Sequence, residues 1–419
     1  MLARAQVSAG DNDDAIATLE QALTSADVPG QWRARVLALL AKLQRVSTGD
    51  LDAVEATDGL ALAVAKEAGD AFAAAHALVD LWLTHGVRRD HAAALDYLDG
   101  ALRVLGDDSS HPDLRSYALS SRIFTLQNLD RWPDAELALR QARQFAQRSG
   151  SPDQATRVTA AVQWYWLGQW DDALAELGSE DTDAYGYLRE RWPALQVHGV
   201  AALIAERRDQ RATASQHQRQ GLAKVLPNQS RTDRENQDFL VAAHGLALEQ
   251  VGETRKAMLR LAGILPRRDG GMTLIHQWLP DLVRLAFAVD DRQMAKAAAE
   301  ACGAEAAAET QPARAAAASL RCQGLLASDP DLLEKAVAHY RAAGPAVELP
   351  AALEDLAVVL AGRGHEEAAR SALNEAVSRY EDLRARWDIR RADSRLRQYG
   401  IKRAFAARAG RERSPAGNR

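Results

Sequence analysis

Polar turn residues and apolar residues form a short sequence pattern that recurs about every forty residues along this chain. We call this repeated pattern the cell. In each copy a Gly or Asp is followed five positions later by an apolar residue that opens an amphipathic run, as in LGQWDDALAEL at 167–177. Gly and Asp end helices or begin new ones, so each cell predicts a turn between two helices. The clear copies are Gly10…Ala15, Gly49…Val54, Asp130…Ala135, Gly168…Ala173, Asp209…Ala214, Gly252…Ala257, Asp290…Ala295 and Gly364…Ala369, with weaker copies near Asp90 and Asp331.

A repeat of this length is typical of stacked helical hairpins, which bury their apolar faces only against their neighbours. The composition agrees, because the 419 residues are rich in Ala, Leu and Arg and include only 13 prolines, a mixture that favours helix. We therefore predict an all-α fold, a tetratricopeptide-like right-handed superhelix of about ten helical hairpins, over residues 1–400. Since each hairpin should contact only the next one, we expect a single elongated body.

The end of the chain has a different character. Residues 401–419 lose the helical periodicity after Gly400 and carry six basic side chains against one acid, Glu412. We interpret this segment as a basic flexible tail or the remnant of a linker. The whole chain has a net charge of −5, so the helical body is acidic. An acidic body neutralises phosphates poorly, and we expect no direct nucleic acid binding by the repeats.

Motifs that carry catalytic or cofactor chemistry are missing from the sequence. It contains no GxxxxGK[ST] phosphate loop, no GxGxxG, no GxSxG and no HExxH. The two cysteines, Cys302 and Cys322, have a spacing that fits neither a zinc site nor a disulfide framework. Acidic pairs such as Asp171-Asp172 open helices, where they favour the positive end of the helix dipole. We expect no enzyme activity, no catalytic residue, no cofactor and no metal site.

Aromatic residues give the only internal hint of a binding site. Trp164, Tyr165, Trp166 and Trp170 lie close together in the sequence. Adjacent residues of a helix point to different faces, so one apolar stripe cannot bury all four. Trp166 and Trp170 could pack together between hairpins, which leaves Trp164 or Tyr165 to bind a ligand or partner in the concave groove. The alternative is that all four side chains pack between hairpins.

The last helical run predicts an amphipathic helix that ends near Gly400. Its apolar positions lie three to five residues apart, so one stripe should dock on the preceding hairpin. The stripe consists of Tyr380, Leu383, Trp387, Ala392, Leu396 and Tyr399. We expect the basic side chains of the same helix to remain largely in solvent. They are Arg390, Arg391, Arg395 and Arg397.

The segment AVSRYEDLRARWDIRRADSRLRQYGIKRAF (376–405) resembles the end of the helical-repeat region in the large ATP-binding regulators of the LuxR family. Other similar segments are LWLTHG (81–86), LDRWPDAELALRQAR (129–143), WYWLGQWDDALAEL (164–177), HGVAALIAERR (198–208), RENQDFLVAAHGLALEQVG (234–252), WLPDLVRLA (278–286) and CQGLLASDPDLLEKA (322–336). Members of that family combine a nucleotide-binding switch domain, a tetratricopeptide-like sensor arm and a C-terminal helix-turn-helix. The resemblance covers about residues 1–405 and only the arm. We therefore expect a fragment or a stand-alone relic of such a regulator.

The resemblance implies a sensor or scaffold arm that binds a small-molecule or protein signal and relays it to switch and DNA-binding domains absent from this chain. Such a signal would sit in the concave groove and shift the stacking of adjacent hairpins. The alternative is a stand-alone tetratricopeptide adaptor that binds a peptide or helix of a partner protein. The sequence contains no signal segment and no apolar run of about 18 residues, so we expect a cytoplasmic protein that does not contact membranes.

Overall fold

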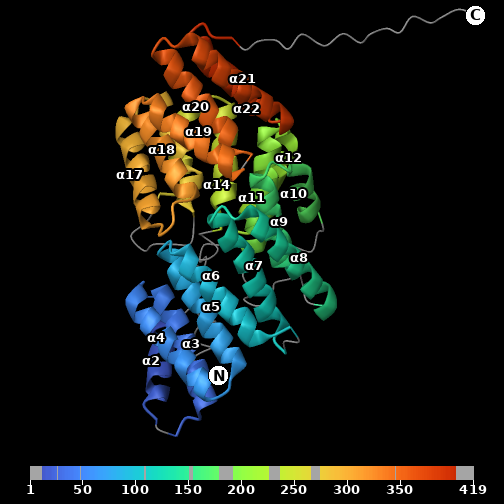
Figure 1. The fold of residues 1–419 in the computed structure, drawn as a ribbon, viewed down its shortest axis with the longest axis vertical. Helices are drawn as coiled ribbons and strands as arrows, with labels where there is room; N and C mark the ends of the chain where they lie inside the picture. Colours follow the sequence, from blue (N-terminus) through green and yellow to red (C-terminus); the bar gives the residue numbers. More distant parts are fainter. Residues whose placement is uncertain are drawn as a thin grey trace, which may run out of the picture.

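The computed structural model describes residues 12–25, 27–47, 49–107, 110–150, 154–178, 192–225, 236–265, 274–344 and 346–402. All regular structure in these ranges is helical (Figure 1), which confirms the predicted all-α fold. No helix in these ranges is long and apolar enough to cross a lipid bilayer. The elements are α2 (Asn12–Leu23), α3 (Gly30–Ser47), α4 (Leu51–Glu67), α5 (Ala71–Val87), α6 (His91–Leu105), α7 (Pro112–Asn128), α8 (Trp132–Ser149), α9 (Gln154–Trp166), α10 (Trp170–Leu177), α11 (Trp192–Arg207), α12 (Arg211–Ala223), α14 (Asp238–Gln250), α15 (Thr254–Ala262), the 3₁₀ helix η1 (Ile275–Gln277), α16 (Leu279–Ala288), α17 (Arg292–Ala308), α18 (Arg314–Ala327), α19 (Pro330–Ala343), α20 (Glu348–Gly362), α21 (Glu366–Asp382) and α22 (Arg386–Arg397).

Consecutive helices pair into hairpins that stack on one another. Within the described ranges nine hairpins are complete, from α3–α4 to α20–α21, and α2 and α22 lie at the two ends of the stack. The first helices of most successive hairpins also pack against each other, for example α7 against α9 and α18 against α20. This regular stacking is that of a helical solenoid.

The recurring cell of the sequence determines the turn inside each hairpin. Its first residue adopts a positive φ, as at Gly168, where φ is +78°. Gly adopts this conformation at no steric cost and Asp tolerates it better than most residues. The residue five positions later is fully buried, as Ala173 is, with 0% of its surface exposed. The weaker copies follow the same geometry with Arg89 and Ser328 in the turn.

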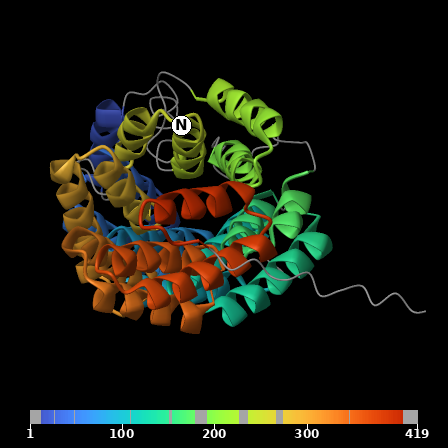
Figure 2. The same ribbon diagram turned by 90° about the horizontal axis from the view of Figure 1, so that it is seen from above.

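The superhelix is wound so tightly that its second turn rests on its first. Arg207 at the end of α11 forms an ion pair with Asp388 in α22, which lies 181 positions and five hairpins further along the chain. Thr310 donates a hydrogen bond to Asp90, at a separation of 220 positions. Seen from above, the helices follow one another round a ring (Figure 2). The expectation that each hairpin contacts only its neighbours is therefore wrong. The curvature of a solenoid depends on the small rotation between repeats, which the repeat period does not specify.

We call the contact between the two superhelical turns the seam. In the first superhelical turn, the seam is formed by the short connections between the two helices of each hairpin. A Cβ atom added to Gly168 would lie 2.5 Å from Leu383 Cδ2 and 2.8 Å from Ala346 Cβ. The amide of Ala346 donates a hydrogen bond of 2.8 Å to the carbonyl of Trp166. Gly252 occupies the same place in a hairpin of the second turn, and a Cβ there would meet nothing within 4 Å. The connection at Gly168, in the first superhelical turn, is therefore covered, whereas the equivalent connection at Gly252, in the second, is open.

The C-terminal helix differs in part from the prediction. The expectation of one helix that carries the whole stripe is wrong, because Tyr380 belongs to α21 and the chain turns at Arg384, where φ is +56°, before α22 begins. α22 ends at Arg397, and Gly400 has a positive φ of 72°. Most of the predicted stripe is buried, whereas Trp387 is half-buried and Tyr399 is exposed. The prediction of solvated arginines is wrong for Arg391, which is 6% exposed, and for Arg395, whose side chain is 20% exposed, because both guanidiniums lie among buried carboxylates. Of the predicted basic tail at 401–419, Ile401 is buried at 2% exposure, and residues 403–419 lie outside the described residues.

Candidate functional site

The interior of the second superhelical turn is polar. Six helices surround it. Five of them, α11, α14, α16, α18 and α20, are the first helices of their hairpins, and the last, α22, contacts α11 to complete the ring. Each helix contributes at least one charged side chain that points toward the others. We call this set the interior network; it consists of Arg207, Glu249, Asp281, Arg284, Arg321, Glu354, Asp355, Asp388, Arg391 and Arg395. Its positive and negative charges are equal in number, so the site has no net charge to offer a ligand.

One half of the network connects the two ends of the ring. Arg207 Nη1 lies 2.7 Å from Asp388 Oδ1, and Arg391 Nη1 lies 2.9 Å from the same oxygen. Arg391 also donates to Glu354, with Nη2 and Oε2 2.8 Å apart. Arg395 Nη1 lies 2.7 Å from both Glu354 Oε1 and Asp355 Oδ1. These bonds join α11 of the first hairpin in the ring to α22 and α20 of the last.

The other half continues the chain of charges through α18, α16 and α14. Arg321 donates to Asp355 in α20 at 2.7 Å and lies 3.7 Å from Asp281 in α16. Arg284 donates to Asp281 at 3.3 Å and to Glu249 Oε2 in α14 at 2.9 Å. The network therefore passes through all six helices without a break.

The charges of the network hold one another in the ionised state. Burial alone would raise the pKa of Glu354, but Arg391 and Arg395 outweigh it and keep this pKa well below its usual value. Burial would lower the pKa of Arg391, but Glu354 and Asp388 raise it well above its usual value. Buried ion pairs of this kind contribute little net stability, yet removing one partner leaves an uncompensated charge. We infer that the network fixes the relative position of the six helices.

Tyr165, predicted as a binding residue, lies inside the fold. Its side chain is 0% exposed, and its hydroxyl accepts a hydrogen bond of 3.1 Å from Arg207 Nε. Burial, partly offset by Arg207, raises the pKa of Tyr165 to about 12. Trp170 stacks on the Tyr165 ring and donates from Nε1 to its carbonyl. Tyr165 therefore links the first turn to the interior network and does not line an open groove.

Trp166 and Trp164 lie on either side of Tyr165 in α9. Trp166 is 3% exposed, and Arg314 of α18 lies over its ring, 4.5 Å from the centroid. Trp164 is half-buried and packs against two apolar clusters of the core. The aromatic group is thus the junction of the two superhelical turns. A binding role for Trp164 or Tyr165 stays a prediction.

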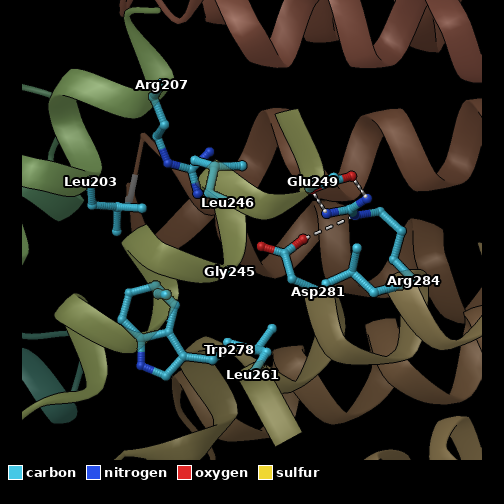
Figure 3. Close-up of a pocket in the computed structure, with 11 residues that line it drawn as sticks. Leu203, Arg207, Gly245, Leu246, Glu249, Leu261, Trp278, Asp281 and Arg284 are labelled. Atoms are coloured by element: carbon cyan, nitrogen blue, oxygen red, sulfur yellow. Dashed lines mark hydrogen bonds and ion pairs between the residues drawn. The ribbon is translucent and has the colours of Figure 1, made fainter. Parts of the chain in front are cut away.

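A small pocket opens beside the network (Figure 3). Its volume is about 30 Å³, room for roughly two water molecules and not for a metabolite. Along one side of the pocket Arg284 bonds to both Asp281 and Glu249, and Trp278 lies on the other side (Figure 3). The remaining lining residues are Leu203, Arg207, Ala242, Gly245, Leu246, Leu261 and Leu285.

The described part of the chain has two buried thiols and no cluster of potential metal ligands. It contains no group of three or more His, Cys, Asp or Glu side chains placed to hold a metal ion. Cys302 and Cys322 are free thiols, both 0% exposed. A hydrogen bond with Cys322, together with burial, raises the pKa of Cys302 well above its usual value. A buried thiol in this state is unreactive.

The interior network has a visible pattern in the sequence, although it matches no known motif. Its charged residues interrupt otherwise apolar runs, as Asp281 and Arg284 do in WLPDLVRLAFAV at 278–289 and as Glu354-Asp355 does in LPAALEDLAVVLAG at 349–362. A charge inside an apolar run is costly to bury unless it is paired. Such positions could therefore have been predicted to pair with one another.

Comparisons with known proteins add little to this geometry. No family model matches the chain, and no curated protein matches it. Among solved structures, one described as "Structure of Naa15/Naa10 bound to HypK-THB" aligns over 97% of this chain and 68% of that chain, with 12% identity and a TM-score of 0.22. A likeness this distant carries no argument about function.

Proposed function

We propose that this chain is a protein-binding helical-repeat arm, and that it serves as the sensor or scaffold arm of a LuxR-family transcription regulator. The role is one of binding and not of catalysis. The family assignment rests on the sequence segments that resemble such arms, above all residues 376–405. The protein-binding role rests on the solenoid architecture, because stacked repeats present extended surfaces that single ligands rarely need.

One observation favours a protein over a small molecule as the signal. The interior of the second turn is filled by paired charges, and the described pocket beside them has a volume of only about 30 Å³. Large apolar side chains are exposed instead at the ends of hairpins, among them Trp32 at 54% and Val251 at 63%. Tryptophan is one of the residues that most often anchor protein interfaces.

The seam supplies an element through which binding could be relayed. Arg207 and Asp388 connect hairpins that are five repeats apart, and Tyr165 of the preceding hairpin bonds to Arg207, so a partner that separates α11 from α22 would loosen the whole second turn. A partner can shift such an equilibrium only by binding one state more tightly than the other. We therefore place the relay at the α11–α22 contact.

The test combines the gene's surroundings with a seam variant. DNA flanking the coding sequence should contain, in frame or adjacent, a phosphate-loop motif and a helix-turn-helix. Arg207→Met in the complete regulator should then change transcription from its target promoter, whereas the exposed-surface control Glu136→Gln should not. Flanking DNA without either motif would refute the regulator assignment and leave the adaptor, which the exposed Trp32 and Val251 also favour.

A further inference from the structure

The edge of the first superhelical turn that faces away from the seam carries an exposed Trp–Arg pair. Trp32 and Arg35 lie near the start of α3, and the Arg35 guanidinium sits over the Trp32 ring, 5.4 Å from its centroid. Trp32 is 54% exposed and the Arg35 side chain is 41% exposed. Arg35 Nε also donates to Asp70 at 2.7 Å. This edge therefore presents an aromatic ring and a guanidinium together to solvent.

The same pair occurs at the seam, where its use is visible. Trp387 and Arg390 lie near the start of α22 with the same spacing, and the Arg390 guanidinium is again 5.4 Å from the tryptophan ring centroid. Arg390 Nη1 donates at 2.8 Å to Asp209, which has a positive φ in the turn between α11 and α12. At the seam, then, the start of a hairpin-opening helix docks on the turn of a hairpin one superhelical turn earlier.

The turn that receives Arg390 also has an uncovered counterpart. Asp290, between α16 and α17, has a φ of +56°, close to the +62° of Asp209. Each aspartate is followed two positions later by an arginine that lies beside its carboxylate, Arg211 at 3.3 Å and Arg292 at 3.8 Å. The Asp209 side chain is 27% exposed, whereas that of Asp290 is 93% exposed. The upper edge of the second superhelical turn therefore repeats the receiving geometry of the seam, and none of the described residues covers it.

We propose that these two edges bind each other between copies of this chain, so that the Trp32–Arg35 edge of one copy docks on the Asp290 turn of the next. The contact continues the seam, with Arg35 in the place of Arg390 and Asp290 in the place of Asp209. A basic side chain meets an acidic one, as at the seam. The exposed Val251, in the neighbouring turn of the same upper edge, adds apolar surface to the contact.

An interface of this type joins two different surfaces. It is heterologous, so each added copy presents a fresh edge and assembly does not close after two. Without a large apolar area we expect weak binding, with a Kd on the order of 10–100 µM. Because an exposed ion pair contributes, the association should weaken as salt concentration rises.

Sedimentation velocity over a concentration series tests the proposal with two variants. Trp32→Ala removes one edge and Asp290→Arg removes the other. Arginine tolerates the conformation at 290, since Arg89 and Arg384 adopt it elsewhere in the chain. Leu137→Ala and Glu136→Arg are matched controls on α8, at positions that are 48% and 52% exposed. The parent and both controls should associate with rising concentration, and each edge variant should weaken association at least tenfold.

Mixing the two variants gives the decisive result. A Trp32→Ala copy retains the Asp290 edge and an Asp290→Arg copy retains the Trp32 edge, so an equimolar mixture should form dimers and stop there. A parent protein that stays monomeric up to about 1 mM, where a contact of even this weak class would be visible, overturns the proposal. So do controls that weaken association as much as the edge variants, or a mixture that remains monomeric.

Discussion

Gly168 and Gly252 allow the energy of the seam to be separated from the energy of the hairpin turn. Both adopt a left-handed conformation, with φ of +78° and +81°, in the turn between two helices. A methyl group at Gly168 would meet Leu383 Cδ2 at 2.5 Å and Ala346 Cβ at 2.8 Å, whereas one at Gly252 would meet nothing within 4 Å. The substitutions Gly168→Ala and Gly252→Ala therefore share the backbone strain and differ in the contact between superhelical turns.

The strain costs both variants about 1–2 kcal/mol, the usual penalty for an alanine in this conformation. Gly168→Ala adds an overpacking cost of about 1–3 kcal/mol, because Leu383 and Ala346 must move. We expect Gly252→Ala to lower the urea midpoint slightly and Gly168→Ala to lower it about twice as far. Hydrogen exchange at Ala346, whose amide donates to Trp166, should accelerate at least tenfold in Gly168→Ala and remain unchanged in Gly252→Ala.

Equal destabilisation by the two substitutions would refute this reasoning. It would mean that Leu383 and Ala346 move aside at no cost, so that the second turn only touches the first. Loss of exchange protection in the α14–α15 hairpin alone after Gly252→Ala would support it, because the added methyl group would meet no atom within 4 Å through which to transmit the strain.

Three further results are expected. Arg207→Met should cost about 3–5 kcal/mol by leaving Asp388 partly unpaired, and Asp388→Leu in the same chain should recover part of that loss in urea unfolding; two additive losses would contradict the coupling. Burial and the Asp80 charge raise the pKa of Asp58 to about 9, so the stability this proton confers is complete below the unfolded pKa and is lost as pH rises toward 9. As pH rises from the unfolded pKa toward 9, the free energy of unfolding of Asp58→Asn should therefore increase relative to that of the parent by up to about 1.4 kcal/mol per pH unit. A difference between the two proteins that does not depend on pH would argue against this reasoning. Gly199→Ala would place a methyl 2.7 Å from the backbone of α14 and should destabilise by at least about 2 kcal/mol, whereas Gly59→Ala, in open space within α4, should stabilise by about 1 kcal/mol.

The hairpins were predictable because their determinants are local. A positive φ favours Gly or Asp, and the helix that follows needs a small apolar residue where it crosses its partner. Both requirements fall within six residues, so the cell around Gly168 and Ala173 is visible in the sequence without knowledge of the rest of the fold. Even the weak copies mark hairpins, although Arg89 and Ser328 occupy turns that composition alone would not reveal.

The closure of the superhelix was not predictable in this way. It depends on the angle between successive hairpins, summed over five of them, and a small error in each angle separates Arg207 from Asp388 by many ångströms. The same summation explains the error about Arg391. On a helix wheel it belongs to a polar face that solvent should cover, and only the return of the chain places Glu354 opposite it.

The aromatic group of α9 shows how a local pattern can identify an important place before its contacts are known. Trp164 and Tyr165 were notable because one helix face could not bury them together with Trp166 and Trp170, which suggested that Trp164 or Tyr165 faced a ligand. The missing contacts are supplied from two places, because Arg314 of the next superhelical turn covers Trp166 and Arg207 of the neighbouring hairpin bonds to Tyr165. A surplus of large side chains on a repeat therefore indicates an additional contact, and the partner can be the chain itself. By the same logic the exposed Trp32 indicates a contact that one copy of the chain cannot make.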